Sequence, residues 1–180
     1  MKQNVKEEIP SIIVFIGMMG AGKTTIGRAL AKELNREFVD LDHEIVRHCG
    51  VPIPTIFDIE GEAGFRRREN LILSSLAQRQ NIVLATGGGA PVSQENQAIL
   101  KTCGKIVYLK APLDELFKRI AKDTNRPLLK TANPKEKVAE LLAVREPIYE
   151  QLADITVETG CGSIYTTVRK LKQQILAQGN

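Results

Sequence analysis

Aromatic residues are scarce in this chain, which has no tryptophan, five phenylalanines and three tyrosines among its 180 residues. Proteins that bind single-stranded nucleic acid stack the bases on aromatic side chains, so this composition offers little for such a platform. The net charge of +4 and the pI near 9.0 are mild, and basic residues alternate with acidic ones along most of the chain. This balance suits a small anionic substrate and does not by itself indicate a nucleic-acid partner.

Cysteine and histidine are also scarce. Cys49, Cys103 and Cys161 are odd in number, far apart and outside any Cys-x-x-Cys pair, which argues against a disulfide framework or a zinc site. We interpret them as reduced thiols. His43 and His48 are five residues apart with no cysteine at a zinc-ligand spacing, so a metal site built on imidazole is not favoured.

Long hydrophobic runs are absent, because no window approaches the roughly 18 apolar residues of a membrane-spanning helix. The first ten residues, MKQNVKEEIP, lack the apolar segment of a signal peptide, and we therefore expect a cytoplasmic protein that does not bind membranes. A chain of 180 residues that is 43% hydrophobic suits one buried core, and no linker or internal repeat divides it. The sequence predicts a single domain over residues 1–180.

Short apolar runs rich in β-branched residues alternate with segments of helical periodicity. The runs predict strands at residues 11–17, 37–41, 81–86, 105–110 and 154–159. Helical patterns lie between and after them, at residues 24–35, 43–49, 69–80, 93–103, 112–122, 134–152 and 164–178. Such alternation predicts an α/β fold with a doubly wound, five-stranded parallel sheet flanked by helices. The least regular segment, DTNRPLLKTANPKEK, is interpreted as a flap between two helices.

A glycine-rich segment follows the first predicted strand. GMMGAGKT, residues 17–24, matches G-x-x-x-x-G-K-[ST] between a buried strand and an amphipathic helix. Glycines in such a loop let backbone N–H groups converge on phosphate oxygens, and the helix N-terminus favours negative charge. A tight glycine turn without a ligand is the alternative. The residues predicted to bind the nucleotide are Gly17, Gly20, Ala21, Gly22, Lys23, Thr24 and Thr25.

Within this loop, Lys23 is expected to bridge the β- and γ-phosphates of ATP, and the Thr24 hydroxyl to ligate Mg²⁺. The loop identifies a nucleotide but not the acceptor. The two later buried strands lack the terminal acid usual in GTPases and ATPase motors, since the third runs into glycines and the fourth ends in Lys110. No Asn-Lys-x-Asp guanine-binding motif is present, so a small-molecule kinase is favoured.

Two aspartates close the second predicted strand. Asp40 and Asp42 are two residues apart, so on an extended chain both point toward the crevice beside the phosphate loop. One carboxylate is expected to hold Mg²⁺ through water, and the other to accept a hydrogen bond from a substrate hydroxyl. An alternative, compatible with this role, is that Asp42 caps the helix predicted at residues 43–49.

The segment GFRRREN, residues 64–70, places charge where a helix buries apolar side chains. At about 100° per residue, Phe65 and Leu76 share an apolar stripe. Glu69 falls in the middle of this stripe, and Arg66 lies beside it. Charge on a buried stripe is expected where a ligand replaces solvent, so Arg66 is predicted to grip an anionic substrate, with Glu69 orienting it. A weak Arg–Glu pair on a solvated edge is the alternative.

Three consecutive glycines, Gly87, Gly88 and Gly89, follow the third predicted strand. One glycine would satisfy a flexible turn, whereas three favour close approach of the backbone to a ligand. Two arginines complete the predicted set. Arg126, in the irregular segment, is expected to stabilise the transferring phosphoryl group when that segment closes, and Arg145, in the next helix, to pair with a substrate carboxylate.

The order and spacing of these motifs resemble the shikimate kinase family over nearly the whole chain. The segments that carry the resemblance are GMMGAGKTTIGRALA, FVDLD, IFDIEGEAGFRRRE, ATGGGA, RIAKDTNRPLL and REPIYEQLAD. The resemblance implies a P-loop fold like that of nucleoside monophosphate kinases. It also implies Mg²⁺-dependent transfer of the ATP γ-phosphate to the 3-hydroxyl of shikimate, a step of chorismate and aromatic amino-acid biosynthesis.

The resemblance implies roles for residues on the acceptor side. Asp42 corresponds to the aspartate that binds the shikimate hydroxyl, and Asp40 to its magnesium-associated partner. Arg66 and Arg145 correspond to the arginines that hold the shikimate carboxylate, and Glu69 to the acid that supports this site. The glycines Gly87, Gly88 and Gly89 correspond to the substrate-facing loop. A substrate-binding region at about residues 40–70 follows from these matches.

On the nucleotide side, Arg126 matches the family's lid arginine, and Arg119 matches a residue that packs against adenine. These matches place a lid at about residues 122–136, with Lys23, Asp42 and Arg126 as the catalytic set. We expect a monomer whose partners are ATP and shikimate. The nearest alternative is a gluconate-kinase-like enzyme of the same fold that acts on another hydroxy acid. A non-catalytic nucleotide-binding module is the alternative from another functional class.

Overall fold

The structure, a computed structural model, describes residues 9–122, 131–160 and 162–177. Within these ranges the strands form one parallel sheet of order β2-β3-β1-β4-β5. The strands are β1 (Ile12–Ile16), β2 (Glu37–Asp40), β3 (Ile82–Ala85), β4 (Lys105–Lys110) and β5 (Ile155–Glu158). The predicted five-stranded parallel sheet is confirmed, and every strand lies within one residue of its expected bounds.

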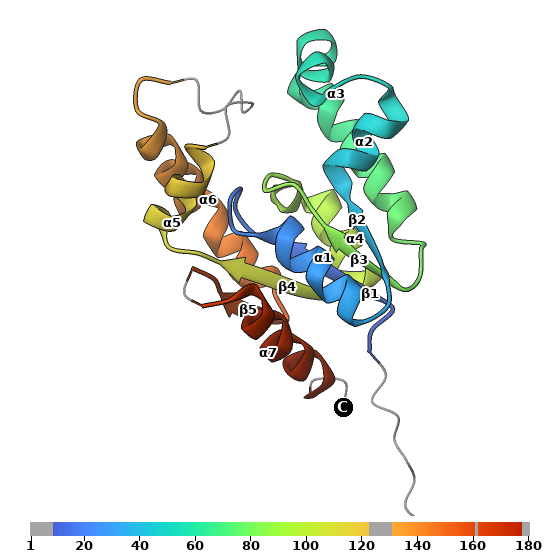
Figure 1. The fold of residues 1–180 in the computed structure, drawn as a ribbon. Coiled ribbons are helices and arrows are strands. Elements are labelled where there is room, and N and C mark those ends of the chain that lie inside the picture. Colours follow the sequence, from blue (N-terminus) through green and yellow to red (C-terminus); the bar gives the residue numbers. More distant parts are fainter. Residues whose placement is uncertain (1–8, 123–130, 161, 178–180) are drawn as a thin grey trace, which may run out of the picture.

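Helices connect the strands and cover both faces of the sheet (Figure 1). They are α1 (Lys23–Glu33), α2 (Leu41–Cys49), α3 (Ile53–Leu76), the 3₁₀ helix η1 (Ala90–Val92), α4 (Gln94–Cys103), α5 (Leu113–Ile120), α6 (Pro134–Leu152) and α7 (Ile164–Ala177). α1 and α7 pack side by side on one face, while α4 and α6 pack against β4 from the other. Among the described residues, none of the helices has the length and apolar character needed to span a bilayer.

The helical pattern at residues 69–80 predicted only the C-terminal part of α3. This helix begins at Ile53, after the N-cap Pro52, and bends at Gly61, where φ is 69° and ψ is −176°. Only glycine adopts this conformation readily, so the bend separates two helical segments that differ in direction. The bend interrupts the 3.6-residue period, and for this reason the helical pattern did not extend to the start of the helix.

The central strand β1 carries the continuous apolar run, and all of its residues are buried. Burial on both faces is expected for a strand in the middle of a parallel sheet that has helices on each side. The carboxyl ends of the parallel strands meet at one edge of the sheet. α2 and α3 rise on one side of this edge, and α5 and the start of α6 on the other (Figure 1). Ligands of open α/β sheets bind at this edge.

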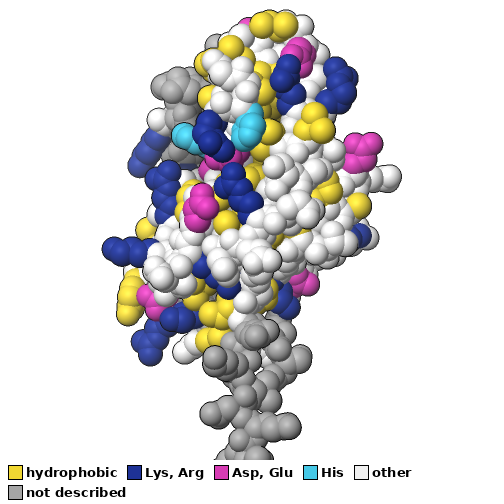
Figure 2. Space-filling view, turned by 90° about the vertical axis from the view of Figure 1, so that its right-hand side faces the viewer, with side chains coloured by type: hydrophobic (Ala, Val, Ile, Leu, Met, Phe, Trp, Pro, Cys, Tyr) yellow, Lys and Arg dark blue, Asp and Glu magenta, His cyan; other side chains and the backbone are white. Residues whose placement is uncertain are grey.

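Charges of both signs are distributed over the face that carries α2. In the view of Figure 2, Lys and Arg side chains are interspersed with Asp, Glu and apolar side chains. This mixture agrees with the mild net charge of +4.

The close approach between the C-terminal end of α4 and the first residue of β1 can be tested directly. Gly104, the C-cap of α4, has an extended backbone with φ of 179°, which any residue adopts, but a Cβ there would overlap the carbonyl oxygen of Ile12. Because backbone cannot move aside as a side chain can, Gly104→Ala is expected to lower the free energy of unfolding by about 3 kcal/mol in urea titrations.

The matched control is Gly50→Ala at the C-cap of α2. Gly50 has φ of 71° and open space where a Cβ would lie. The control therefore carries only backbone strain and should cost about 1 kcal/mol. A Gly104→Ala variant that loses no more stability than the control would contradict the packing described here.

Candidate active site

The phosphate-binding segment joins β1 to α1 at the carboxyl edge of the sheet. Gly17, Gly20 and Gly22 have φ angles of 142°, 80° and 97°, in the left-handed region that favours glycine. Gly22 is the N-cap of α1, and its residue type supplies no capping side chain to the first turn. The N–H groups of this turn therefore face the loop as donors for an anion, and the helix dipole adds positive potential there.

Side-chain hydrogen bonds to its carbonyl groups hold the loop in place. The Lys23 Nζ donates to the carbonyl oxygens of Gly17 and Met18 at 2.7 and 2.8 Å, so the amine lies over the loop. The Arg119 Nη1 donates to the carbonyl oxygen of Gly20 at 2.9 Å, which places this exposed arginine of α5 beside the loop. Thr25 is exposed in the first turn of α1.

Asp40 links the phosphate loop to α2. The Thr24 Oγ1 donates to its Oδ2 at 3.3 Å, and its Oδ1 accepts from the backbone N–H of His43 at 3.2 Å. Asp40 therefore caps α2, and the alternative that gave this cap to Asp42 is wrong. The reason is that α2 begins at Leu41, directly after the strand, so Asp42 lies in the first helical turn.

Residues 87–91, which follow β3, are called the glycine loop below. Its three glycines lie against three predicted functional side chains. Their φ angles lie outside the left-handed region, so glycine is needed there for close approach and not for backbone conformation. A Cβ built on each would meet the following atoms: at Gly87, the Asp42 Oδ1 at 2.9 Å; at Gly88, the Arg145 Nη1 at 3.3 Å; and at Gly89, the Arg66 Nη2 at 2.6 Å. The fold thus gathers two guanidinium groups and a carboxylate around one loop, beside the phosphate-binding segment.

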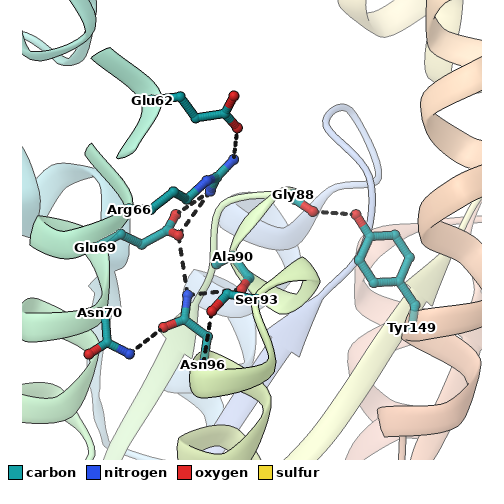
Figure 3. Close-up of polar contacts among 9 residues, drawn as sticks. All are labelled: Glu62, Arg66, Glu69, Asn70, Gly88, Ala90, Ser93, Asn96 and Tyr149. Carbon is teal, nitrogen blue, oxygen red and sulfur yellow. Dashed lines mark hydrogen bonds and ion pairs between the residues drawn. The ribbon is translucent and has the colours of Figure 1, made fainter. Parts of the chain in front are cut away.

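Arg66 is fixed by an ion pair within α3. Its Nη1 lies 2.9 and 3.1 Å from the Glu69 Oε1 and Oε2, and its Nη2 lies 3.6 Å from the exposed Glu62 (Figure 3). Glu69 is 1% exposed. The intrahelical Arg–Glu pair of the alternative is therefore present, but its placement on a solvated edge is wrong, because Glu69 is buried.

Burial raises the pKa of Glu69 above its ordinary value, and repulsion from Asp42 acts in the same direction. The charge and hydrogen bonds of Arg66, together with a hydrogen bond from the Asn96 Nδ2 at 3.2 Å, partly offset this shift. On the other side of the loop, burial raises the pKa of Tyr149 to about 12. The Tyr149 hydroxyl therefore stays protonated, and it donates to the carbonyl oxygen of Gly88 at 2.5 Å.

Comparison with known proteins identifies the family. A family model described as shikimate kinase matches residues 19–176. The chain belongs to the shikimate kinase family. A curated shikimate kinase from Bordetella avium (strain 197N) is 52% identical over 165 residues, which cover 92% of this chain and 79% of the relative. One from Bordetella pertussis (strain Tohama I) is 53% identical, covering 92% of this chain and 78% of the relative.

Solved structures agree with this assignment. A shikimate kinase from Acinetobacter baumannii in complex with shikimate has a TM-score of 0.89 and 47% identity, and the match covers 93% of each chain. A gluconokinase from Sinorhizobium meliloti 1021 has a TM-score of 0.62 and 19% identity, over 95% of this chain and 94% of that one. The second similarity shows only the shared fold, which is the P-loop fold of the nucleoside monophosphate kinases.

Sequence reasoning missed three polar side chains of this family member that brace the site. Tyr149 donates to the glycine loop, and Asn96 donates to Glu69. The Thr159 Oγ1, just after β5, donates to the carbonyl oxygen of Ala21 at 3.1 Å and so supports the phosphate loop. Tyr149 lies in the quoted segment REPIYEQLAD, and Asn96 interrupts an amphipathic helix near its start. These were the available signals. Arg126 and most of the predicted lid lie outside the described residues.

The buried carboxyl group gives a testable pH dependence. Because native Glu69 binds its proton more tightly than unfolded Glu69, its contribution to stability is complete below the unfolded pKa and is lost as the pH rises through the raised native pKa. Glu69→Gln removes this titration. The free energy of unfolding of the wild type, relative to that of Glu69→Gln, should therefore fall as the pH is raised from about 4 toward neutrality in urea titrations.

Glu62→Gln is the matched control, because Glu62 pairs with the same arginine but its side chain is 71% exposed. Exposed ion pairs contribute little to stability, so this variant should follow the wild type across the same pH series. A difference between wild type and Glu69→Gln that stays constant with pH would contradict a raised native pKa for Glu69.

Proposed function

We propose that this protein transfers the γ-phosphate of ATP to the 3-hydroxyl of shikimate, giving ADP and shikimate 3-phosphate. The observation that carries the proposal is the convergence of Asp42, Arg66 and Arg145 on the glycine loop beside the phosphate-binding segment. A carboxylate-bearing polyol needs an anion clamp and a hydroxyl acceptor at one place, and these side chains supply both. Curated shikimate kinases about half identical to this chain support the choice of acceptor.

The acceptor is held by its carboxylate and its hydroxyl. The guanidinium groups of Arg66 and Arg145 bind the carboxylate, since a planar fork of N–H donors matches its two oxygens. Glu69 keeps Arg66 in position without touching the acceptor. Asp42 accepts a hydrogen bond from the hydroxyl that is to be phosphorylated. Backbone N–H groups of the glycine loop border the same space, because no Cβ separates them from a ligand there.

Phosphoryl transfer relies on positioning and charge. Lys23 exchanges its two carbonyl partners in the loop for the β- and γ-phosphates, whose charge it neutralises. Asp42 orients the attacking hydroxyl and accepts its proton as the new bond forms. The transition state of such a transfer is loose, so little assistance from a base is needed and orientation is the larger contribution of Asp42. Arg126, outside the described residues, is proposed as the closing lid arginine.

The oxygen ligands present suit Mg²⁺. The Thr24 hydroxyl and the Asp40 carboxylate are 3.3 Å apart beside the phosphate loop, and hard oxygen ligands of this kind would hold the ion. Across the described ranges there is no cluster of three or more His, Cys, Asp or Glu side chains that could hold a metal alone. A site completed by substrate phosphates and water is the usual arrangement for Mg²⁺, which when bound neutralises phosphate charge. We further expect a cytoplasmic monomer without nucleic-acid or membrane partners.

The first test is ADP release from Mg·ATP with shikimate, with gluconate and without an acceptor. Shikimate should stimulate release in the wild type, and gluconate should not. Arg66→Ala removes one half of the carboxylate clamp, and kcat/KM for shikimate should fall about a hundredfold or more. Stimulation by gluconate alone would show that the acceptor assignment is wrong, and nucleotide binding without turnover on either acid would favour a non-catalytic module.

A second test uses the glycine that faces Arg66. Gly89 has φ of −87°, so alanine fits the backbone, but its Cβ would displace the Arg66 guanidinium group. Gly89→Ala should raise KM for shikimate about tenfold, because the clamp is moved and not removed. KM for ATP and the thermal midpoint should change little. Equal increases in both KM values would argue against a local effect on acceptor binding.

A further inference from the structure

Asn96 lies in the first turn of α4 and is 1% exposed. Its Nδ2 donates to the Oε1 of Glu69 at 3.2 Å and to the carbonyl oxygen of Ala90 at 2.9 Å, and its Oδ1 accepts from the Nδ2 of Asn70 at 2.9 Å (Figure 3). A buried amide with both of its polar atoms engaged is held in a single orientation.

The partners of Asn96 determine which way its amide group faces. A carboxylate oxygen and a carbonyl oxygen only accept hydrogen bonds, so the amide nitrogen has to face Glu69 and Ala90. The amide oxygen then faces the donor group of Asn70. The backbone of Asn96 is fixed as well, because its N–H donates to the capping Oγ of Ser93 at 3.4 Å.

These contacts connect three elements. Arg66 pairs with Glu69 on α3, Glu69 accepts from Asn96 on α4, and Asn96 donates to Ala90 in η1. Ala90 follows Gly89, where a Cβ would lie 2.6 Å from the Arg66 guanidinium group. The hydrogen bonds therefore run from Arg66 through Glu69 and Asn96 to Ala90, the residue after the glycine that faces Arg66, and Asn96 binds both the carboxylate and the loop.

We propose that Asn96 is a positioning residue for the acceptor: it sets the distance between the Arg66–Glu69 pair and the glycine loop. This inference rests on the proposed function, because the space between these groups is where the shikimate carboxylate binds. Asn96 touches neither substrate. Its hydrogen bond to Glu69 keeps that carboxylate aimed at Arg66, and its hydrogen bond to Ala90 keeps the loop beside the same guanidinium group.

Two substitutions test the role of the amide nitrogen. Asn96→Ala removes both donor hydrogen bonds, and KM for shikimate should rise about tenfold, while kcat and KM for ATP stay within about threefold. Asn96→Asp keeps the shape but turns a carboxyl group toward two acceptors. The charged group in contact with this position is Glu69, which in turn faces Arg66 on α3 and Asp42 on α2. Beyond these, Glu62 pairs with Arg66, and Arg145 of α6 lies beside Gly88.

The KM of Asn96→Asp for shikimate should depend on pH, whereas a simple loss of packing would give a KM that does not. At about pH 6 the two adjacent carboxyl groups share one proton, which restores a donor between them, and KM for shikimate should lie within about threefold of the wild type. At about pH 8.5 the shared proton is lost, and KM should rise about tenfold. The Asn96→Ala variant should show the same increase at both pH values.

Gln97→Ala is the matched control. The Gln97 Nε2 donates to the carbonyl oxygen of Pro91 at 2.9 Å, so this neighbour also braces the loop from α4. This hydrogen bond goes to the loop and not to Glu69, so its loss should leave KM for shikimate within about twofold of the wild type. Thermal unfolding of all three variants is measured in parallel to separate positioning from general loss of stability.

The outcomes distinguish failure of the proposed function from failure of the positioning role of Asn96. If the wild type turns over no shikimate, the proposed function fails before Asn96 is tested. If the wild type is active but Gln97→Ala raises KM as much as Asn96→Ala, or the KM of Asn96→Asp does not depend on pH, the positioning role is overturned. If Asn96→Ala does not fold, the pH series on Asn96→Asp gives the decision alone.

Discussion

The acceptor side of this protein depends on one buried carboxylate. Glu69 is removed from water, and such a charge is stable in the folded protein only if it is paired and hydrogen-bonded. Arg66 supplies the pair from one helical turn earlier, which fixes a guanidinium group at the mouth of the site. Glycine at position 89 follows from this placement, since any larger residue would occupy the space of that guanidinium group. Burial of the Glu69 carboxylate thus accounts for the position of Arg66 and for the glycine at residue 89.

The sheet provides the second constraint. Because all strands are parallel, the phosphate loop after β1, Asp40 at the end of β2 with Asp42 just beyond it, and the glycine loop after β3 reach the same edge, although they are far apart in the sequence. Helix α6 returns to this edge and adds Arg145 and Tyr149, so the glycine loop is held from two sides. Phosphate and acceptor sites are therefore neighbours as a consequence of strand order, and few polar contacts are needed to align them.

Much of this arrangement could be predicted from the sequence. Apolar runs of strand length and the P-loop motif have local signatures, and so does a carboxylate on an apolar stripe. Three features could not be predicted. The bend at Gly61 interrupts helical periodicity, the cap on α2 shifts to Asp40 because the helix starts directly after the strand, and Asn96 acts through partners on other elements. Hydrogen bonds between distant elements depend on packing, which leaves no periodic signal in the chain.

The most direct measurement is calorimetric binding of shikimate, and of its neutral carboxamide analogue, to the wild type and to Arg66→Ala. Glu69 is proposed to position Arg66 for a substrate carboxylate. The wild type should therefore bind the acid at least about tenfold more tightly than the amide, and Arg66→Ala should lose most of this preference. An undiminished preference for the acid in Arg66→Ala would contradict the account, because the carboxylate would then be bound elsewhere.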